Sequence, residues 1–262
     1  MEFANEFEIA QKVIKEAGKL ALSYFEKGVA RSFKEDYSVL TEADEAVEKY
    51  IKSKLSRQFP EYGFIGEESV AEEKNIAWIV DPIDGTVAFA RHILEFGIAL
   101  ALKKGNQLIF CIQSLPITGN LITAYTGHGA HDNGKQLKVS TVSDPKKALF
   151  SLGAENFWVE NYQPYSLQIL TKNYKKRFRS GPSSVVESYY LASGKVDALI
   201  KLNQALWDAG PASLLMKEAG AIVTDEFGRP LNLQLSAGTK YNYVATNKFL
   251  AKNAKDVLYK KL

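Results

Sequence analysis

The stretch WIVDPIDGTVAF, residues 78–89, carries an apolar strand-like run directly into two aspartates, Asp81 and Asp84. Pro82 restricts the backbone between them, and Gly85 permits a conformation that other residues avoid. This turn predicts that both carboxylates face one site and that the carbonyl of Ile83 is left free as a ligand. Ordinary turns use the same residue types, so the interpretation depends on the rest of the chain.

Three further segments place acids at expected element ends. They are TEAD with Asp44, IGEES with Glu67 and Glu68, and LWDAG with Asp208. Each has a purely structural alternative: a capping box from Thr41 to Asp44, a solvated loop at residues 67–68, and a helix N-cap at Asp208. Taken singly, none of these segments requires a functional site.

Taken together, the acids favour a metal site. Five or six carboxylates in one cleft repel each other strongly unless cations compensate them. The chain has one cysteine and three histidines, so its ligand set is dominated by hard oxygen atoms. Such atoms suit Mg²⁺, which takes a few carboxylates and also accepts substrate phosphate oxygens.

Gly85 and Thr86 follow the second aspartate at the expected start of a short helix, TVAFAR. Backbone N–H groups at a helix N-terminus bind anions, and glycine allows a close approach. A phosphate held there would lie beside the metals. The Thr86 hydroxyl is expected to orient a water molecule, with Asp44 as its hydrogen-bond partner.

The first half of the chain predicts an α+β arrangement. Apolar residues recur at helical spacing over about residues 4–27 and again over 40–55. Residues 78–140 indicate a largely antiparallel sheet, with strands WIVD, FGIALALKK, QLIFCIQSL, NLITAYT and KQLKVS separated by glycine-containing turns.

The second half predicts an α/β arrangement of alternating strands and helices. Strands are expected at LFSLGA, FRS, VDALIKL and AIVTD, and helices at residues 161–173, 184–194, 212–220 and 248–258. We therefore expect an N-terminal part, 1–143, with the metal and phosphate site, and a C-terminal part, 144–262, that supplies Asp208 and the substrate pocket. The two parts are expected to form one compact unit.

Composition limits the function classes. The 262 residues are 46% hydrophobic and 24% charged, with a net charge of +3, which is ordinary for a globular protein and too mild to indicate nucleic-acid binding. The single Cys111 excludes an intramolecular disulfide. Residues 1–20 are acidic and amphipathic, unlike a signal peptide, and no apolar run reaches membrane-spanning length. We expect a cytoplasmic protein with neither a membrane nor a nucleic-acid partner.

The sequence resembles the inositol monophosphatase family, the Mg²⁺-dependent, lithium-sensitive phosphatases that include fructose-1,6-bisphosphatase. The resemblance rests on GEES at 66–69, WIVDPIDGT at 78–86, GHGAHDNGKQLKVS at 127–140 and WDAGPASLLMKEAGAIVTDEFGRPL at 207–231. It implies an αβαβα layered sandwich, a homodimer, two to three Mg²⁺ ions and a small phosphorylated metabolite as substrate.

The resemblance also implies roles for individual residues. The first metal would be held by Glu67, Asp81 and the Ile83 carbonyl, and the second by Asp81, Asp84 and Asp208. Thr86 with Asp44 would activate the attacking water, supported by Glu68, and the amides of Gly85 and Thr86 would hold the phosphate. Water attack on a phosphomonoester would then proceed in line, without a phosphoenzyme.

Three departures from the family bear on the substrate. Val87-Ala88-Phe89 replaces the usual Thr-Asn-Phe, and the loop after it carries Leu94 and Glu95. Where inositol-type enzymes have a polyol-binding glutamate, counting back from Asp208 reaches Lys201, which favours a substrate with a second anionic group. The structural alternative is an exposed lysine at a strand end. Ser184 is expected to face the substrate pocket.

The sequence leaves alternatives open. The leading hypothesis is a phosphomonoesterase acting on inositol monophosphate or a similar metabolite. The others are a bisphosphate-specific enzyme, for fructose 1,6-bisphosphate or 3′-phosphoadenosine 5′-phosphate, and a non-catalytic regulator that binds phosphate or metal.

Overall fold

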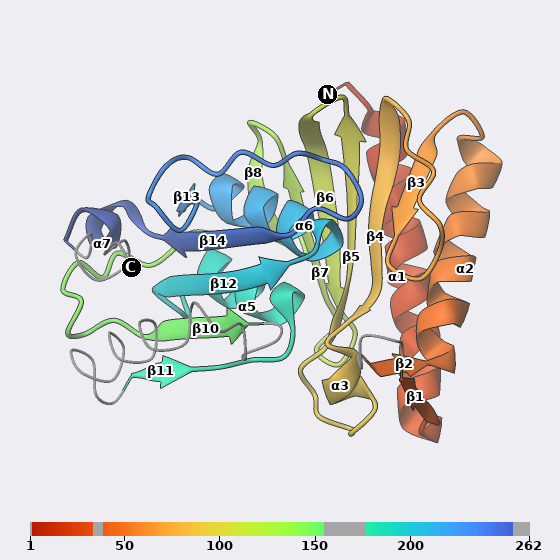
Figure 1. Ribbon diagram of the computed structural model, residues 1–262, viewed down its shortest axis with the longest axis horizontal. Coiled ribbons are helices and arrows are strands. Elements are labelled where there is room, and N and C mark those ends of the chain that lie inside the picture. The colour runs from red at the N-terminus through yellow and green to blue at the C-terminus, as the bar shows by residue number, and fades with distance from the viewer. Residues whose placement is uncertain (1, 34–38, 155–176, 254–262) are drawn as a thin grey trace.

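The computed structural model describes residues 2–33, 39–154 and 177–253, and these form five alternating layers (Figure 1). Two long helices, a seven-stranded sheet, two central helices, a five-stranded sheet and a terminal helix follow one another across the molecule. This arrangement confirms the expected αβαβα layered sandwich. In the described part of the chain, no helix is both long and apolar enough to cross a membrane.

The outer layer consists of α1 (Ala4–Lys27) and α2 (Glu42–Gln58), close to the ranges that the apolar spacing predicts. Their buried faces, which include Ile14, Ala17, Val47 and Ile51, pack on the large sheet. A small pair of antiparallel strands, β1 (Arg31–Phe33) and β2 (Val39–Thr41), leads into α2. The acid Asp44 therefore enters from the start of α2.

The large sheet has the strand order β3-β4-β5-β6-β7-β8-β9. Only β3 and β4 run parallel, so the expected, largely antiparallel sheet is confirmed. The strands are β3 (Gly63–Gly66), β4 (Ile76–Asp84), β5 (Gly97–Lys104), β6 (Gln107–Leu115), β7 (Asn120–Tyr125), β8 (Gly129–Asp132) and β9 (Lys135–Gln136).

Both faces of this sheet are buried, as β5 shows. Ile98, Leu100 and Leu102 pack toward α1 and α2, whereas Ala99 and Ala101 contact the core around the central helices. The small alanines allow those helices to approach the sheet closely. The strand therefore appears in the sequence as a continuous apolar run.

The central layer holds α5 (Ser184–Ala192) and α6 (Leu206–Glu218) between the two sheets (Figure 1). The helix expected from residue 212 begins six residues earlier, at Leu206. Asp208 therefore lies inside its first turn and is not the N-cap, which is Ala205, and Pro211 lies within the helix.

The smaller sheet has the order β11-β10-β12-β14-β13. Its strands are β10 (Phe150–Ala154), β11 (Phe178–Arg179), β12 (Ala198–Gln204), β13 (Ile222–Thr224) and β14 (Tyr241–Thr246), and α7 (Lys248–Asn253) follows. The expected helix at 161–173, and the end of the last helix beyond residue 253, lie outside the described residues.

Candidate metal and phosphate site

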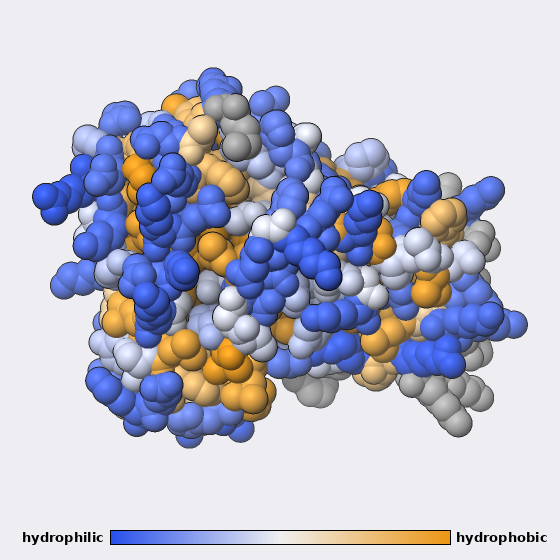
Figure 2. Space-filling view, turned by 180° about the vertical axis from the view of Figure 1, so that it is seen from behind, coloured by the Kyte–Doolittle hydropathy of each residue, from blue (hydrophilic) through white to orange (hydrophobic). Residues whose placement is uncertain are grey.

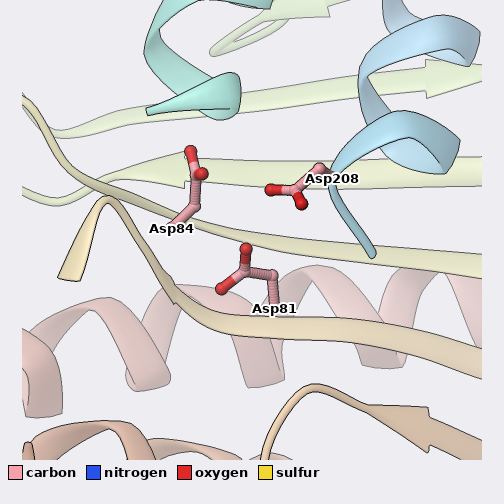
Figure 3. A group of neighbouring side chains, drawn as sticks. All are labelled: Asp81, Asp84 and Asp208. Atoms are coloured by element: carbon pink, nitrogen blue, oxygen red, sulfur yellow. The ribbon is translucent and has the colours of Figure 1, made fainter. Parts of the chain in front are cut away.

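Three aspartates from two elements meet in the interior (Figure 3). Asp81 and Asp84 lie near the end of β4, and Asp208 lies in the first turn of α6. One carboxylate oxygen from each lies within 4.8 Å of the others, and the three residues are only 2%, 5% and 7% exposed. The carboxylates point toward one another, which brings together the acids that the sequence placed in two separate motifs.

An irregularity in β4 directs both aspartates to one side. Residues three apart on a regular strand face opposite sides of the sheet. Here Asp81 pairs with Ala99 and Asp84 pairs with Gly97, so three residue steps on β4 match two on β5. Such a bulge compensates for the three-residue separation and turns the Asp84 side chain to the same side as Asp81. The DPID segment therefore brings Asp81 and Asp84 to one side of the sheet, as expected from the sequence.

One carboxylate oxygen of Asp81 has no hydrogen-bond partner among the described residues. This atom, Oδ1, is buried. Burial, followed by the charges of Glu67, Asp84 and Asp208, raises the pKa of Asp81 well above its usual 3.8. An orphaned buried oxygen and mutually repelling carboxylates are what a divalent cation satisfies, so this set of ligands fits Mg²⁺.

Asp84, in contrast, is anchored by the N-terminus of α5. It accepts hydrogen bonds from the Ser183 hydroxyl, from the Ser184 amide at 3.0 Å and from the Val185 amide at 2.5 Å. Burial raises its pKa, and these hydrogen bonds together with the charge of Lys201 oppose that rise. A residue from the large sheet thus fixes the position of a central helix.

Asp44 satisfies both of its predicted roles. Its Oδ2 accepts hydrogen bonds from the amide of Thr41 at 2.8 Å and from the Thr41 hydroxyl at 2.5 Å, which closes the capping box of α2. Its Oδ1 lies 3.1 Å from the Thr86 hydroxyl. The same hydroxyl lies 2.9 Å from the Ile83 carbonyl oxygen. Thr86 is therefore held between two acceptors beside the aspartates.

Gly85 occupies a position that only glycine fits without strain. Its φ is +90°, in the left-handed region, where it caps the short helix α3 (Thr86–Phe89). A Cβ there would lie 3.0 Å from the Glu95 carbonyl oxygen and 3.1 Å from the Ser183 Cβ. The backbone at the expected phosphate site is thus packed tightly against Glu95 and Ser183.

Glu67 and Glu68 lie in the half-buried loop after β3. Glu67 lies outside the group of three aspartates, although its charge is the largest that raises the pKa of Asp81. The Glu68 amide donates to the carboxylate of Glu48 at 2.9 Å, and Gly66 passes directly over that carboxylate. The buried Glu48 on α2 therefore holds this loop in place.

Ser184 and Lys201 are both buried. The Ser184 hydroxyl donates to the side chain of Gln204 at 2.7 Å. The Lys201 ammonium lies 2.5 Å from the Glu187 carboxylate, and both side chains are almost fully enclosed. Lys201 is therefore not the exposed strand-end lysine of the structural alternative, and its pairing disfavours the predicted contact with substrate.

Sequence reasoning missed three residues that shape the site: Glu48, Ser183 and Glu187. Ser183 had a readable signal, since it precedes an apolar helix as an N-cap does, and its hydroxyl accepts the Val186 amide at 3.1 Å. Glu48 and Glu187 are acids on buried helix faces, where a charge requires a partner. Those partners come from other elements, so the sequence alone does not identify them.

Comparisons with known proteins find similar chains along nearly the whole length of this one. The profile of the inositol monophosphatase family matches residues 4–261. Nus factor SuhB of Salmonella typhimurium is 28% identical over 256 residues, covering 95% of this chain and 91% of its own. Human inositol monophosphatase 1 is 30% identical over 235 residues, covering 84% and 81%.

A solved structure of similar shape is the extragenic suppressor protein suhB of Bartonella henselae. It is 25% identical, covers 99% of this chain and 100% of its own, and superimposes with a TM-score of 0.89. The likeness therefore extends over both sheets and all the layers between them.

Proposed function

The chain belongs to the inositol monophosphatase family, and we propose that it is a Mg²⁺-dependent phosphomonoesterase that hydrolyses a small phosphorylated metabolite such as an inositol monophosphate. One observation carries the proposal. The orphaned Asp81 oxygen and the Asp84 and Asp208 carboxylates converge beside a Thr86 hydroxyl that is itself fixed by Asp44. A protein that only bound phosphate would not require that hydroxyl.

In the proposed site, Asp81, Asp84 and Asp208 hold Mg²⁺, with Glu67 and the Ile83 carbonyl as further ligands. Two to three ions would fit the family. When bound, Mg²⁺ neutralises phosphate oxygens, lowers the pKa of water and stabilises the leaving alkoxide. The protein contributes a buried, fixed set of oxygen atoms, so that little reorganisation is needed on binding.

Thr86 has one hydroxyl hydrogen, which it donates either to Asp44 or to the Ile83 carbonyl oxygen. Its own oxygen lone pairs remain to accept a hydrogen from a water molecule. Because Thr41 holds Asp44 from the other side, the orientation of the hydroxyl is set before substrate arrives. The amides of Gly85 and Thr86 at the start of α3 are the proposed phosphate donors, and Glu68 supports the same region from its loop.

Substrate choice is proposed to lie with residues around α5 and the loop after α3. Ser184 stays a predicted pocket residue, although its hydroxyl is bonded to Gln204. Arg179 is the more accessible cation: its side chain is 21% exposed and lies 2.7 Å from Glu95. The bisphosphate alternative would therefore use Arg179 in place of Lys201.

A screen of phosphomonoesters and bisphosphates, ranked by kcat/KM with Mg²⁺ and with a chelator, tests the proposal. Thr86→Val should lower kcat at least a hundredfold, the usual scale for a residue that orients a reacting group. Thr118→Val, in an exposed turn, is the matched control and should behave like wild type. Equal activity of the two variants would contradict the role of Thr86.

The second candidate is a non-catalytic regulator, and it is favoured by one finding: the SuhB relatives are named as Nus factors. These relatives lend no support to the expectation that the chain has no nucleic-acid partner. Turnover of any phosphomonoester that requires Mg²⁺ and is suppressed by lithium distinguishes the enzyme from the regulator.

We also propose a cytoplasmic homodimer. Apolar side chains are exposed after α3, at Ile93 and Leu94, and on β11 at Phe178. Figure 2 shows that the face seen from behind is mostly hydrophilic but carries separate apolar patches. Light scattering at micromolar protein concentration, which gives the mass in solution, tests the dimer.

A further inference from the structure

Lys201 is a buried lysine whose side chain fits only because a glycine lies opposite it. It lies on β12, 3% exposed, directly opposite Gly153 on β10. A side chain at position 153 would overlap both the Lys201 ammonium and the carboxylate of Glu187. The glycine thus leaves room for the ion pair, whose atoms lie 2.5 Å apart.

Glu187 is held from several sides as well. It accepts hydrogen bonds from the Ser151 hydroxyl and from the Gly181 amide at 3.1 Å, and Arg179 lies 3.5 Å away. A carboxylate with this many donors is fixed in place. The ammonium that it holds is therefore fixed too, and Lys201 is unable to swing into an open pocket.

The same helix turn connects this pair to the metal cluster. Ser184 and Val185, at the start of α5, donate their amides to Asp84, and Glu187 follows in the next turn. Lys201 is also connected to Asp208 along the chain. Strand β12 continues from Lys201 through Gln204 to the first turn of α6, where Asp208 accepts a hydrogen bond from the Ala205 amide at 3.2 Å. Lys201 is therefore connected to Asp84 through Glu187 and α5, and to Asp208 through β12.

The charges interact across this short span. Burial lowers the pKa of Lys201, but Glu187, Asp84 and Asp208 outweigh that effect and raise it overall. The ammonium consequently stays charged at all physiological pH values. In return, its charge is among the causes that hold down the pKa of Asp84.

We propose that Lys201 is a built-in counter-cation for Asp84 and Asp208, which stabilises these two carboxylates before a divalent ion binds and weakens the binding of that ion. The inference rests on the proposed metal site. Lys201 acts as a positioning residue without touching substrate. Two like charges in a poorly solvated interior repel each other, so the fixed ammonium weakens the binding of Mg²⁺. When Mg²⁺ is absent, the ammonium compensates part of the negative charge of the carboxylates.

The test compares Mg²⁺ dissociation constants by calorimetry with melting temperatures of the metal-free protein. Lys201→Gln with Glu187→Gln removes the ion pair without leaving a lone buried charge. This double variant should bind Mg²⁺ more tightly by about twofold to fivefold, because the Lys201 charge acts on Asp84 more strongly than the Glu187 charge and its loss is only partly offset by loss of the carboxylate. Its metal-free form should melt at a lower temperature. Glu187→Gln alone keeps the ammonium and should bind Mg²⁺ more weakly than wild type.

Lys103→Gln is the matched control. Lys103 is also buried, but its ammonium donates to the Leu235 carbonyl at 2.7 Å and is not among the charges acting on the aspartates. This variant should lose stability at an unchanged Mg²⁺ affinity. If the glutamine pair does not fold, Lys201→Met with Glu187→Met makes the same comparison.

An Mg²⁺ affinity in the double variant that equals or falls below that of wild type would overturn the counter-cation role, because a merely structural pair lowers stability without tightening metal binding. If wild type itself binds no Mg²⁺, the metal site and the proposed function fail together. The two failures are therefore distinguishable by the wild-type titration.

Discussion

At the scale of single residues, Asp81 carries a charge that the metal-free fold accommodates poorly. Its pKa is raised by burial and by neighbouring carboxylates. A carboxyl with a raised pKa in the folded state stabilises the fold at low pH and loses that contribution as pH rises through the folded pKa. The metal-free protein should therefore lose stability as the pH rises from about 4 toward neutrality.

Asp81→Asn should remove the loss of stability that the metal-free protein shows as the pH rises. At pH 7 without metal, the variant should be more stable than wild type by roughly 1–3 kcal/mol, the usual range for a change at a buried charged site. Adding Mg²⁺ should stabilise wild type and leave the variant unchanged. Chemical denaturation at pH 5 and pH 7, with and without Mg²⁺, measures all of this; a metal-free variant less stable than wild type would contradict it.

Gly85→Ala tests the tight backbone at the phosphate site. The new Cβ meets the Glu95 carbonyl oxygen and Ser183, and the positive φ adds strain, so the free energy of unfolding should fall by about 2–4 kcal/mol. Gly119→Ala has a similar φ of +70° with nothing within 4 Å, and is the control. Thermal melting of both variants separates the effect of the new Cβ contacts at position 85 from the effect of the positive φ, which both positions share. Equal losses would show that the contact adds nothing.

At this scale, the sequence predicted correctly that Asp81, Asp84 and Asp208 lie together, because carboxylates after apolar runs require an unusual environment. Asp44 turned out to serve both as a cap and as the partner of Thr86, so its two predicted roles were not exclusive. The environment of Lys201 was not predictable. It depends on Glu187 and Gly153, which the chain brings together only on folding.

At the scale of elements, the N-terminus of α5 joins the two halves of the site. Ser183→Ala removes the helix cap and the hydrogen bond to Asp84 together. We expect a loss of about 1–2 kcal/mol in stability, as for other N-caps, and a reduced Mg²⁺-dependent kcat, because Asp84 loses one of its three hydrogen bonds to the start of α5. Denaturation and steady-state kinetics measure the two effects.

Asn247→Ala is the control for this prediction. Asn247 caps α7 by accepting the amides of Phe249 and Leu250, within the small sheet's outer layer. It should lose comparable stability and keep its kcat. A similar kcat in both variants would mean that Ser183 acts only as a cap.

The elements that the sequence predicted are those with strong apolar patterns, such as α1 and β6. The strands β8 and β14 escaped prediction, because GAHD has little apolar character and YNYVAT alternates polar and apolar residues weakly. The strand expected at KQLKVS ends at Gln136, since the Val139 amide bonds instead to Ala219 after α6. Those outcomes depend on tertiary partners.

At the scale of the whole molecule, α6 packs on both sheets and carries Asp208 at one end. Its other end is tied to the large sheet by Glu218, which accepts the amides of Gly127 and Gly129 at 2.9 and 2.8 Å. Glu218→Gln keeps one acceptor oxygen, so stability should fall by about 1–2 kcal/mol while kcat stays unchanged. Unfolding curves and kinetics check this; a large fall in kcat would show that both ends of α6 are coupled.

In the proposed enzyme, Asp81, Asp84 and Asp208 hold the Mg²⁺ on which phosphomonoester hydrolysis depends. The most direct test of this claim is phosphate release from inositol 1-phosphate, with EDTA and after Mg²⁺ is restored, by wild type and by Asp208→Asn. We predict release by wild type only with Mg²⁺, and release reduced at least a hundredfold by a variant that keeps its circular dichroism spectrum. Wild-type-like release by folded Asp208→Asn would contradict the claim.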